Sequence, residues 1–182
     1  MKKLLAVFAL VLGFTSVSQA GLLLEPYIGY EMGTAKSDSG GDGKTEAVNV
    51  GGRIAYTLPV MFWLGVDANV GTSGKYKPDT GTDVDTKRTS LSAVVGMDFP
   101  ILLRAWLAYG FVNEIKFDDA FDSKVKGSNV KVGVGFTGLP FVSLNVEYIK
   151  DDFKDVDTNL GSGTTDLKHD SVMLSVSLPF EI

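Results

Sequence analysis

The chain has 182 residues, no cysteine, and 22 Asp and Glu against 17 Lys and Arg. Without cysteine it can form neither a disulfide framework nor a thiolate metal site, and its acidic balance argues against nucleic acid as a partner. Its length is that of one domain, and its 21 glycines and 10% aromatic residues suit an all-β chain.

The first twenty residues have the organisation of a secretory signal peptide. Lys2 and Lys3 precede an apolar run that ends at Phe14, and the small residues Ser18 and Ala20 occupy the cleavage-determining positions. The apolar run has about eleven residues, whereas a membrane-spanning helix needs roughly 18 or more. We therefore divide the chain into a signal peptide, 1–20, and a mature domain, 21–182.

Four prolines divide the mature domain at intervals of about forty residues, the spacing of a hairpin with two long strands. Pro59, Pro100, Pro140 and Pro179 each lie in a short apolar phrase. Between these phrases lie polar stretches rich in Asp, Gly, Ser, Thr and Lys, at 35–46, 73–87, 116–127 and 151–167. The pattern predicts tight turns at one end of a β structure and long solvated loops at the other.

The segments between these breaks alternate apolar and polar residues with period two, which is typical of strands with one apolar face. In the last segment Val172, Leu174 and Val176 share one face, whereas Ser175 and Ser177 share the other. The segments match the length of about 9 to 11 residues with which a strand crosses a bilayer. We expect eight strands, at 22–34, 47–57, 62–72, 88–98, 102–115, 128–138, 141–150 and 168–180.

The second face of these strands is small and charged. It carries acids and bases in nearly equal number, together with glycines that suit a narrow lumen. Because an unpaired buried charge is costly, we expect these groups to pair with one another inside a barrel. The expected ion network, with a structural role, comprises Glu25, Glu31, Arg53, Asp67, Arg88, Asp98, Arg104, Lys131 and Glu147.

Alternation alone also permits the opposite polarity, a soluble lipocalin-like barrel with its apolar face around a ligand. Long strands, glycine on the charged face, and long loops opposite short turns favour the membrane. The prediction is therefore an all-β chain that forms an eight-stranded antiparallel up-and-down transmembrane β-barrel.

Aromatic residues support this interpretation because they gather at both ends of the expected strands, as the two girdles of a membrane barrel do. The turn-end group is Tyr56, Phe62, Phe99, Phe136, Phe141 and Phe180. The loop-end group is Tyr30, Tyr109, Phe111 and Tyr148.

The signal peptide, the paired long strands, the short proline turns and the closing segment Ser171 to Phe180 resemble the OmpA/OmpX-like family of small outer-membrane barrels. The resemblance implies a monomer in the bacterial outer membrane, reached through the periplasm and surrounded by lipid and lipopolysaccharide. It also implies recognition of a terminal phenylalanine by the outer-membrane assembly machinery. Here the chain ends Phe180-Glu181-Ile182, which makes Phe180 the candidate assembly signal.

His169 and Ser171 prompt a test for chemistry, because some barrels of this size deacylate lipid A with His, Ser and Glu. On the expected last strand both side chains face the lumen rather than lipid. Glu181, the acid downstream of Ser171, falls near the opposite membrane face. We therefore expect no catalytic residue, no cofactor and no enzymatic activity.

One polar stretch partly matches a calcium-binding loop. Its candidate ligands are Asp155, Asp157, Asn159 and Asp166, but Leu160 occupies the position at which such a loop needs glycine. Charged loop residues are usually just solvated, so we expect no specific metal site.

The functional expectation is a non-enzymatic integral outer-membrane barrel with a largely plugged polar lumen. It would contribute to membrane integrity or make surface contacts through its loops. A small pore for ions or small molecules and a soluble ligand-binding barrel remain the alternatives.

Overall fold

The computed structural model describes residues 21–37, 42–59, 61–79, 81–118 and 122–182. The expected signal peptide lies outside these residues. The strands are β1 (Gly21–Ser37), β2 (Gly43–Thr57), β3 (Phe62–Pro78), β4 (Val84–Phe99), β5 (Leu103–Phe117), β6 (Lys124–Leu139), β7 (Val142–Thr158), β8 (Gly161–Ser177) and β9 (Phe180–Glu181). Across the described part of the chain, no helix is long and apolar enough to cross a membrane.

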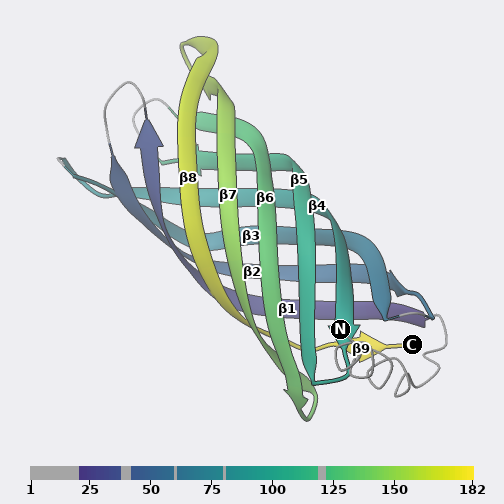
Figure 1. Ribbon diagram of the computed structural model, residues 1–182. Coiled ribbons are helices and arrows are strands. Elements are labelled where there is room, and N and C mark those ends of the chain that lie inside the picture. The colour runs from purple at the N-terminus through teal and green to yellow at the C-terminus, as the bar shows by residue number, and fades with distance from the viewer. Residues whose placement is uncertain (1–20, 38–41, 60, 80, 119–121) are drawn as a thin grey trace, which may run out of the picture.

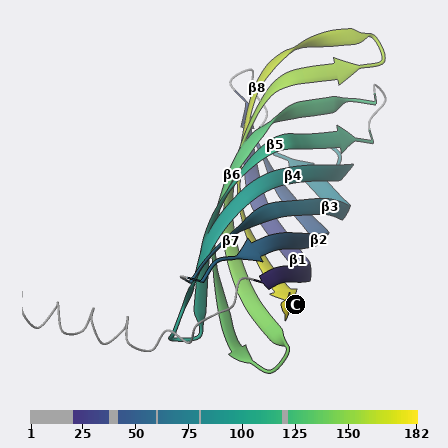
Figure 2. The ribbon, with the colours of Figure 1, turned by 90° about the vertical axis from the view of Figure 1, so that its right-hand side faces the viewer.

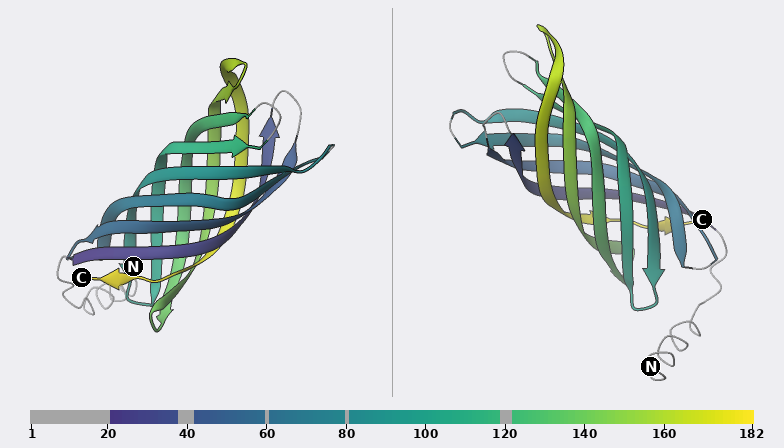
Figure 3. Two further views of the ribbon diagram at one scale, coloured as in Figure 1. Left: turned by 180° about the vertical axis from the view of Figure 1, so that it is seen from behind. Right: turned by 45° about the horizontal axis from the view of Figure 1, so that its top comes forward.

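Each strand from β1 to β7 pairs antiparallel with the next in sequence, and β8 pairs with β1 to close the sheet. The result is an inclined up-and-down barrel (Figure 1). The short strand β9 lies along the first residues of β1 at the turn end (Figure 3). The predicted eight-stranded antiparallel barrel is confirmed.

The prediction of long loops at one end is wrong. Strands β7 and β8 extend to Thr158 and from Gly161, so most of the stretch at 151–167 belongs to one hairpin, which projects beyond the other strands (Figure 2). The strands in the other polar stretches are extended in the same way. The backbone hydrogen bonds between these strands continue beyond the apolar zone. Backbone pairing does not require apolar side chains on the outer face, which is the pattern from which the strands were predicted.

The connections at the opposite end are as short as the prolines predicted. The segments at 58–61, 100–102 and 140–141 join consecutive strands, and Met61, Leu102 and Phe141 there adopt positive φ angles of 60°, 60° and 64°. The last strand ends earlier than expected, at Ser177. Leu178 and Pro179 interrupt it, since proline has no backbone donor for a ladder.

The barrel wall has its apolar side chains outside and its charged side chains inside. On β6, Val132 is 51% exposed, whereas the next residue inward, Lys131, is 2% exposed. On β1 the outward residues run from Leu22 to Met32. With a rise of about 3.3 Å per residue and a tilt of about 45°, this apolar band is about 23 Å tall, close to the height of about 25 Å in outer-membrane barrels. The soluble-barrel alternative, which required the reverse polarity, is wrong.

Every aromatic residue assigned to the two girdles is exposed on the outer surface, from 39% for Phe99 to 84% for Phe141. At the loop end, the hydroxyl of Tyr30 donates to Glu46 at 2.8 Å and that of Tyr148 donates to Asp170 at 2.7 Å. A ring in the apolar band with its hydroxyl on a charged group is the arrangement expected at a membrane interface.

Candidate functional site in the barrel lumen

The nine residues expected in the ion network all lie on the inward face of their strands, because strand alternation puts every second side chain into the lumen. Eight of them are at most 7% exposed, and Asp98, at the turn end, is partly exposed. The structure brings them together at two levels, one around Arg53 and one around Arg88.

Arg53 on β2 is the centre of the turn-side level. Its Nη1 lies 3.0 Å from Oε2 of Glu25 on β1, and its Nη2 lies 3.1 Å from Oε1 of Glu147 and 3.6 Å from Oδ2 of Asp67. Glu147 is on β7, which is not a neighbour of β2 in the barrel. The guanidinium group therefore joins opposite sides of the wall.

Two further bases complete this level. Nζ of Lys131 on β6 lies 2.8 Å from Oδ1 of Asp67 on β3, and Nη1 of Arg104 on β5 lies 3.2 Å from Oε2 of Glu25 on β1. Arg104 also donates from Nε to Asp98 at 2.5 Å. Because the first two pairs span strands that do not touch in the sheet, they cross the lumen rather than follow its wall.

Two buried tryptophans frame the same level, and neither belongs to the expected network. The guanidinium carbon of Arg53 lies 4.5 Å from the Trp106 ring centroid and 5.4 Å from that of Trp63, within the range of cation–π attraction. Nε1 of Trp106 donates to Oε1 of Glu147 at 2.8 Å. Trp63 shares strand parity with Asp67, so its position was available from the sequence pattern.

Glycines make room for these rings. A Cβ added at Gly133 would overlap the ring of Trp106, and one added at Gly96 would overlap that of Trp63. We expect Gly133→Ala to lower the free energy of unfolding by about 1 to 3 kcal/mol, the usual cost of overpacking a filled interior. Urea titration of the refolded barrel, followed by the gel mobility of the folded form, measures this loss. Gly163→Ala is the control, because its added Cβ would meet a neighbour only at 3.7 Å.

The loop-side level is built around Arg88 on β4. Its Nη1 lies 2.7 Å from Oε1 of Glu31 on β1, and its Nη2 lies 2.5 Å from Oδ1 of Asp151 on β7. Its Nε donates to Asn113 at 3.3 Å, so all three nitrogens of the guanidinium group have an acceptor. This level also braces strands that are not neighbours in the sheet.

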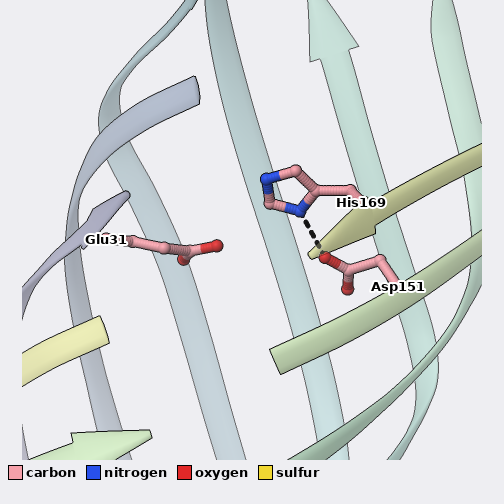
Figure 4. A group of neighbouring side chains, drawn as sticks. All are labelled: Glu31, Asp151 and His169. Carbon is pink, nitrogen blue, oxygen red and sulfur yellow. Dashed lines mark hydrogen bonds and ion pairs between the residues drawn. The ribbon is translucent and has the colours of Figure 1, made fainter. Parts of the chain in front are cut away.

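His169 extends the loop-side level toward the barrel mouth. Its Nδ1 lies 2.6 Å from Oδ2 of Asp151, as Figure 4 shows, and its Nε2 lies 2.7 Å from Oγ1 of Thr45. The ring therefore lies between a carboxylate, which can only accept a hydrogen bond, and a hydroxyl group, which can donate or accept one. Ser171 donates to Glu31 at 2.7 Å, so its hydroxyl proton is directed away from His169.

Glu31, Asp151 and His169 each offer a ligand atom, and these atoms lie within 4.8 Å of one another. Arg88 already lies against both carboxylates, however, and its charge balances one of them. A metal ion would have to compete with a guanidinium group that is held by direct hydrogen bonds. The arrangement therefore fits an ion-paired brace better than a metal centre.

The calcium-like stretch is not a loop. Asp155 and Asp157 lie on β7 and Asp166 on β8, and only Asn159 falls between the strands. Oδ2 of Asp157 lies 2.6 Å from Nζ of Lys126, and Asp166 lies 3.5 Å from Lys168.

The pair of Asp157 and Lys126 lies beyond the apolar band. The hydrogen bond from the Lys126 ammonium lowers the pKa of the Asp157 carboxyl, and the carboxylate raises the pKa of Lys126. The pair therefore links β7 to β6 at neutral pH, and this link is lost as pH falls through the lowered pKa of Asp157.

Sequence reasoning missed Asp151 and Asn113, and it placed His169 toward the lumen without including it in the ion network. Asp151 was assigned to a loop because the seventh strand was ended at residue 150. The signal was available, since Asn145, Glu147 and Ile149 already share its parity.

A family model described as "Outer membrane protein beta-barrel domain" matches residues 6–180. No curated protein sequence matches the chain. Among solved structures, Neisserial surface protein A is 18% identical with a TM-score of 0.61, over 86% of this chain and 97% of that chain. Ail of Yersinia pestis is 18% identical with a TM-score of 0.59, over 89% and 100%. OprG of Pseudomonas aeruginosa is 13% identical with a TM-score of 0.51, over 88% and 96%. At these identities the likeness concerns the fold.

Proposed function

Because this chain belongs to the family of outer membrane protein beta-barrel domains, we propose that it is a non-enzymatic barrel of the bacterial outer membrane whose lumen is plugged by its own ion pairs. In this role it contributes to the integrity of the membrane and presents its hairpins for surface contacts. Export by residues 1–20 and assembly through Phe180 are parts of the same proposal. Phe180 is 50% exposed at the turn end.

One observation carries the proposal: ion pairs cross the lumen at two levels between strands that are not neighbours. Arg53 pairs with Glu147 across the turn-side level, and Arg88 pairs with Asp151 across the loop-side level. A narrow eight-stranded barrel has room inside for side chains and little else. Two braced levels therefore favour a closed lumen over a pore.

Surface contact is supported by the hairpin of β7 and β8, which extends past the apolar band as paired strands. Its outward side chains are solvated acids and bases, such as Asp152 and Lys154 at 3.4 Å. A paired hairpin presents these groups in fixed positions and loses less entropy on binding than a flexible loop would.

We expect the refolded mature barrel to carry no steady current in planar bilayers, because the two ion-paired levels leave no continuous aqueous path. Insertion is verified separately by protease protection in vesicles, and an open porin serves as the positive control. A large, steady, salt-dependent current through the unmodified barrel would contradict the plugged lumen and indicate a small pore instead.

The cellular part of the proposal is tested in a strain that lacks the gene. A variant whose β7–β8 hairpin is shortened to a tight turn is expressed in this strain. If the variant restores detergent resistance, the barrel wall is responsible for membrane integrity. Loss of surface attachment by the same variant would assign contacts to the hairpin. If neither property differs between the deletion strain and its parent, both roles are wrong.

A further inference from the structure

The lumen changes character above the Arg88 level. A cavity of about 280 Å³ opens there at the loop end of the barrel. Its floor is formed by Glu31, Arg88 and His169, but most of its wall is apolar. The apolar wall residues are Ala35, Ala47, Ile115, Phe117, Phe153 and Leu167.

The polarity of the wall is inverted at this height. Leu167 and Phe153 face the cavity, whereas their sequence neighbours Lys168 and Lys154 are exposed on the outside. Within the apolar band the same strands place Val172 outward and Ser171 inward. Beyond the membrane, the wall therefore has the polarity of a soluble barrel that binds a ligand.

An ordinary apolar core at this end of the barrel would fill the cavity. Protein interiors pack to the density of organic crystals, and voids larger than a water molecule are few. Tyr76 and Phe117 meet edge to face at 6.1 Å and Phe153 is fully buried, so the wall is ordered and does not collapse into the cavity. Apolar walls with a few polar groups are typical of small-molecule sites.

The floor indicates which polar group a ligand needs. Three of the five N–H groups of Arg88 donate to Glu31, Asp151 and Asn113, and its single positive charge is already shared by the two carboxylates. The carboxylates of Glu31 and Asp151 outnumber the single guanidinium, which disfavours a second anion. One acceptor is available instead: Oγ1 of Thr45, which lines the cavity 2.7 Å from Nε2 of His169, has two lone pairs and can accept a further hydrogen bond.

We propose that this cavity binds a small apolar molecule that carries one hydrogen-bond donor, a hydroxyl or an amine, with its apolar body against the wall and its donor on the Thr45–His169 pair. Carboxylic acids of the same shape are excluded. The site is a dead end, because the Arg88 level lies beneath it. It does not depend on the membrane-integrity or contact roles proposed above.

The probe for this site is p-cresol, compared with p-toluate, which replaces the hydroxyl with a carboxylate. The mature barrel is refolded in nanodiscs, and binding is followed by isothermal titration, with empty nanodiscs as the blank for partition into lipid. We expect saturable binding of one p-cresol per barrel and binding of p-toluate at least about tenfold weaker.

Two variants test the geometry. Ala47→Phe fills the cavity from its wall and should abolish the saturable signal, and Thr45→Val keeps the shape while removing the hydroxyl, which should weaken binding by about fivefold to tenfold. Lys168→Ala, on the outer surface beside His169, should bind like the unmodified barrel. Folding of each variant is verified by gel mobility.

Absence of saturable p-cresol binding to the unmodified barrel overturns the proposal. So does binding that survives in a folded Ala47→Phe variant, because the ligand would then lie elsewhere. Equal binding of p-toluate and p-cresol overturns the assignment of the donor-bearing ligand class.

Discussion

Replacing Arg53 with methionine should lower the free energy of unfolding by about 3 to 5 kcal/mol, the cost of breaking a buried ion pair by removing one partner. The guanidinium group lies within 3.6 Å of oxygens from Glu25, Glu147 and Asp67, and all four side chains are at most 2% exposed. Methionine fills part of the volume but leaves these carboxylates without their shared cation. Urea titration of the barrel in lipid vesicles, read by the mobility of the folded form, measures the loss.

A matched control distinguishes the loss of a buried charge from the general effect of replacing a cation with methionine. Lys154 is a surface cation whose side chain is 73% exposed and 3.4 Å from Asp152, so Lys154→Met should change stability by less than about 1 kcal/mol. Adding Glu147→Gln to Arg53→Met should restore part of the loss, because it removes one of the stranded charges. If Arg53→Met costs no more than the control, the turn-side level does not stabilise the barrel through its charges.

The barrel and its polarity could be predicted because lipid imposes one strict pattern on every strand. Along β8, Val172, Leu174 and Val176 must face hydrocarbon, which forces the intervening Met173 and Ser175 inward. The same rule predicted the inward position of Lys131 and Arg53. The identity of their partners could not be predicted, because pairs across a lumen depend on strand tilt and stagger, and alternation carries neither.

The strands were predicted too short at their loop-side ends for a related reason. At Leu167 and Lys168 the alternation continues, but its sense is reversed, with the apolar residue inside and the charged residue outside. A pattern that changes sense midway resembles an irregular polar stretch, and it was interpreted as a loop. The loop-side level was therefore only half predicted: Glu31 and Arg88 were expected in the lumen, but Asp151 was assigned to a loop.

If lipid surrounds the outer surface, the cost of introducing a charge there should depend on its depth in the membrane. Val132 lies on β6 within the apolar band, paired with Tyr148 on one side and Leu107 on the other, and all three side chains are exposed. We expect Val132→Arg to lower the free energy of unfolding by about 2 to 4 kcal/mol, the cost of arginine near the bilayer midplane of a barrel. Refolding titrations in vesicles of defined lipid measure it.

The decisive comparison is the same substitution above the band. Thr34 faces outward on β1 two residues beyond Met32, so Thr34→Arg should cost no more than about 1 kcal/mol, because arginine there reaches water. A soluble barrel would tolerate both substitutions equally, since both side chains would point into solvent. Similar small costs at the two positions would therefore show that hydrocarbon does not surround Val132, whereas a difference of about 1 kcal/mol or more ties the exposed apolar band to the membrane.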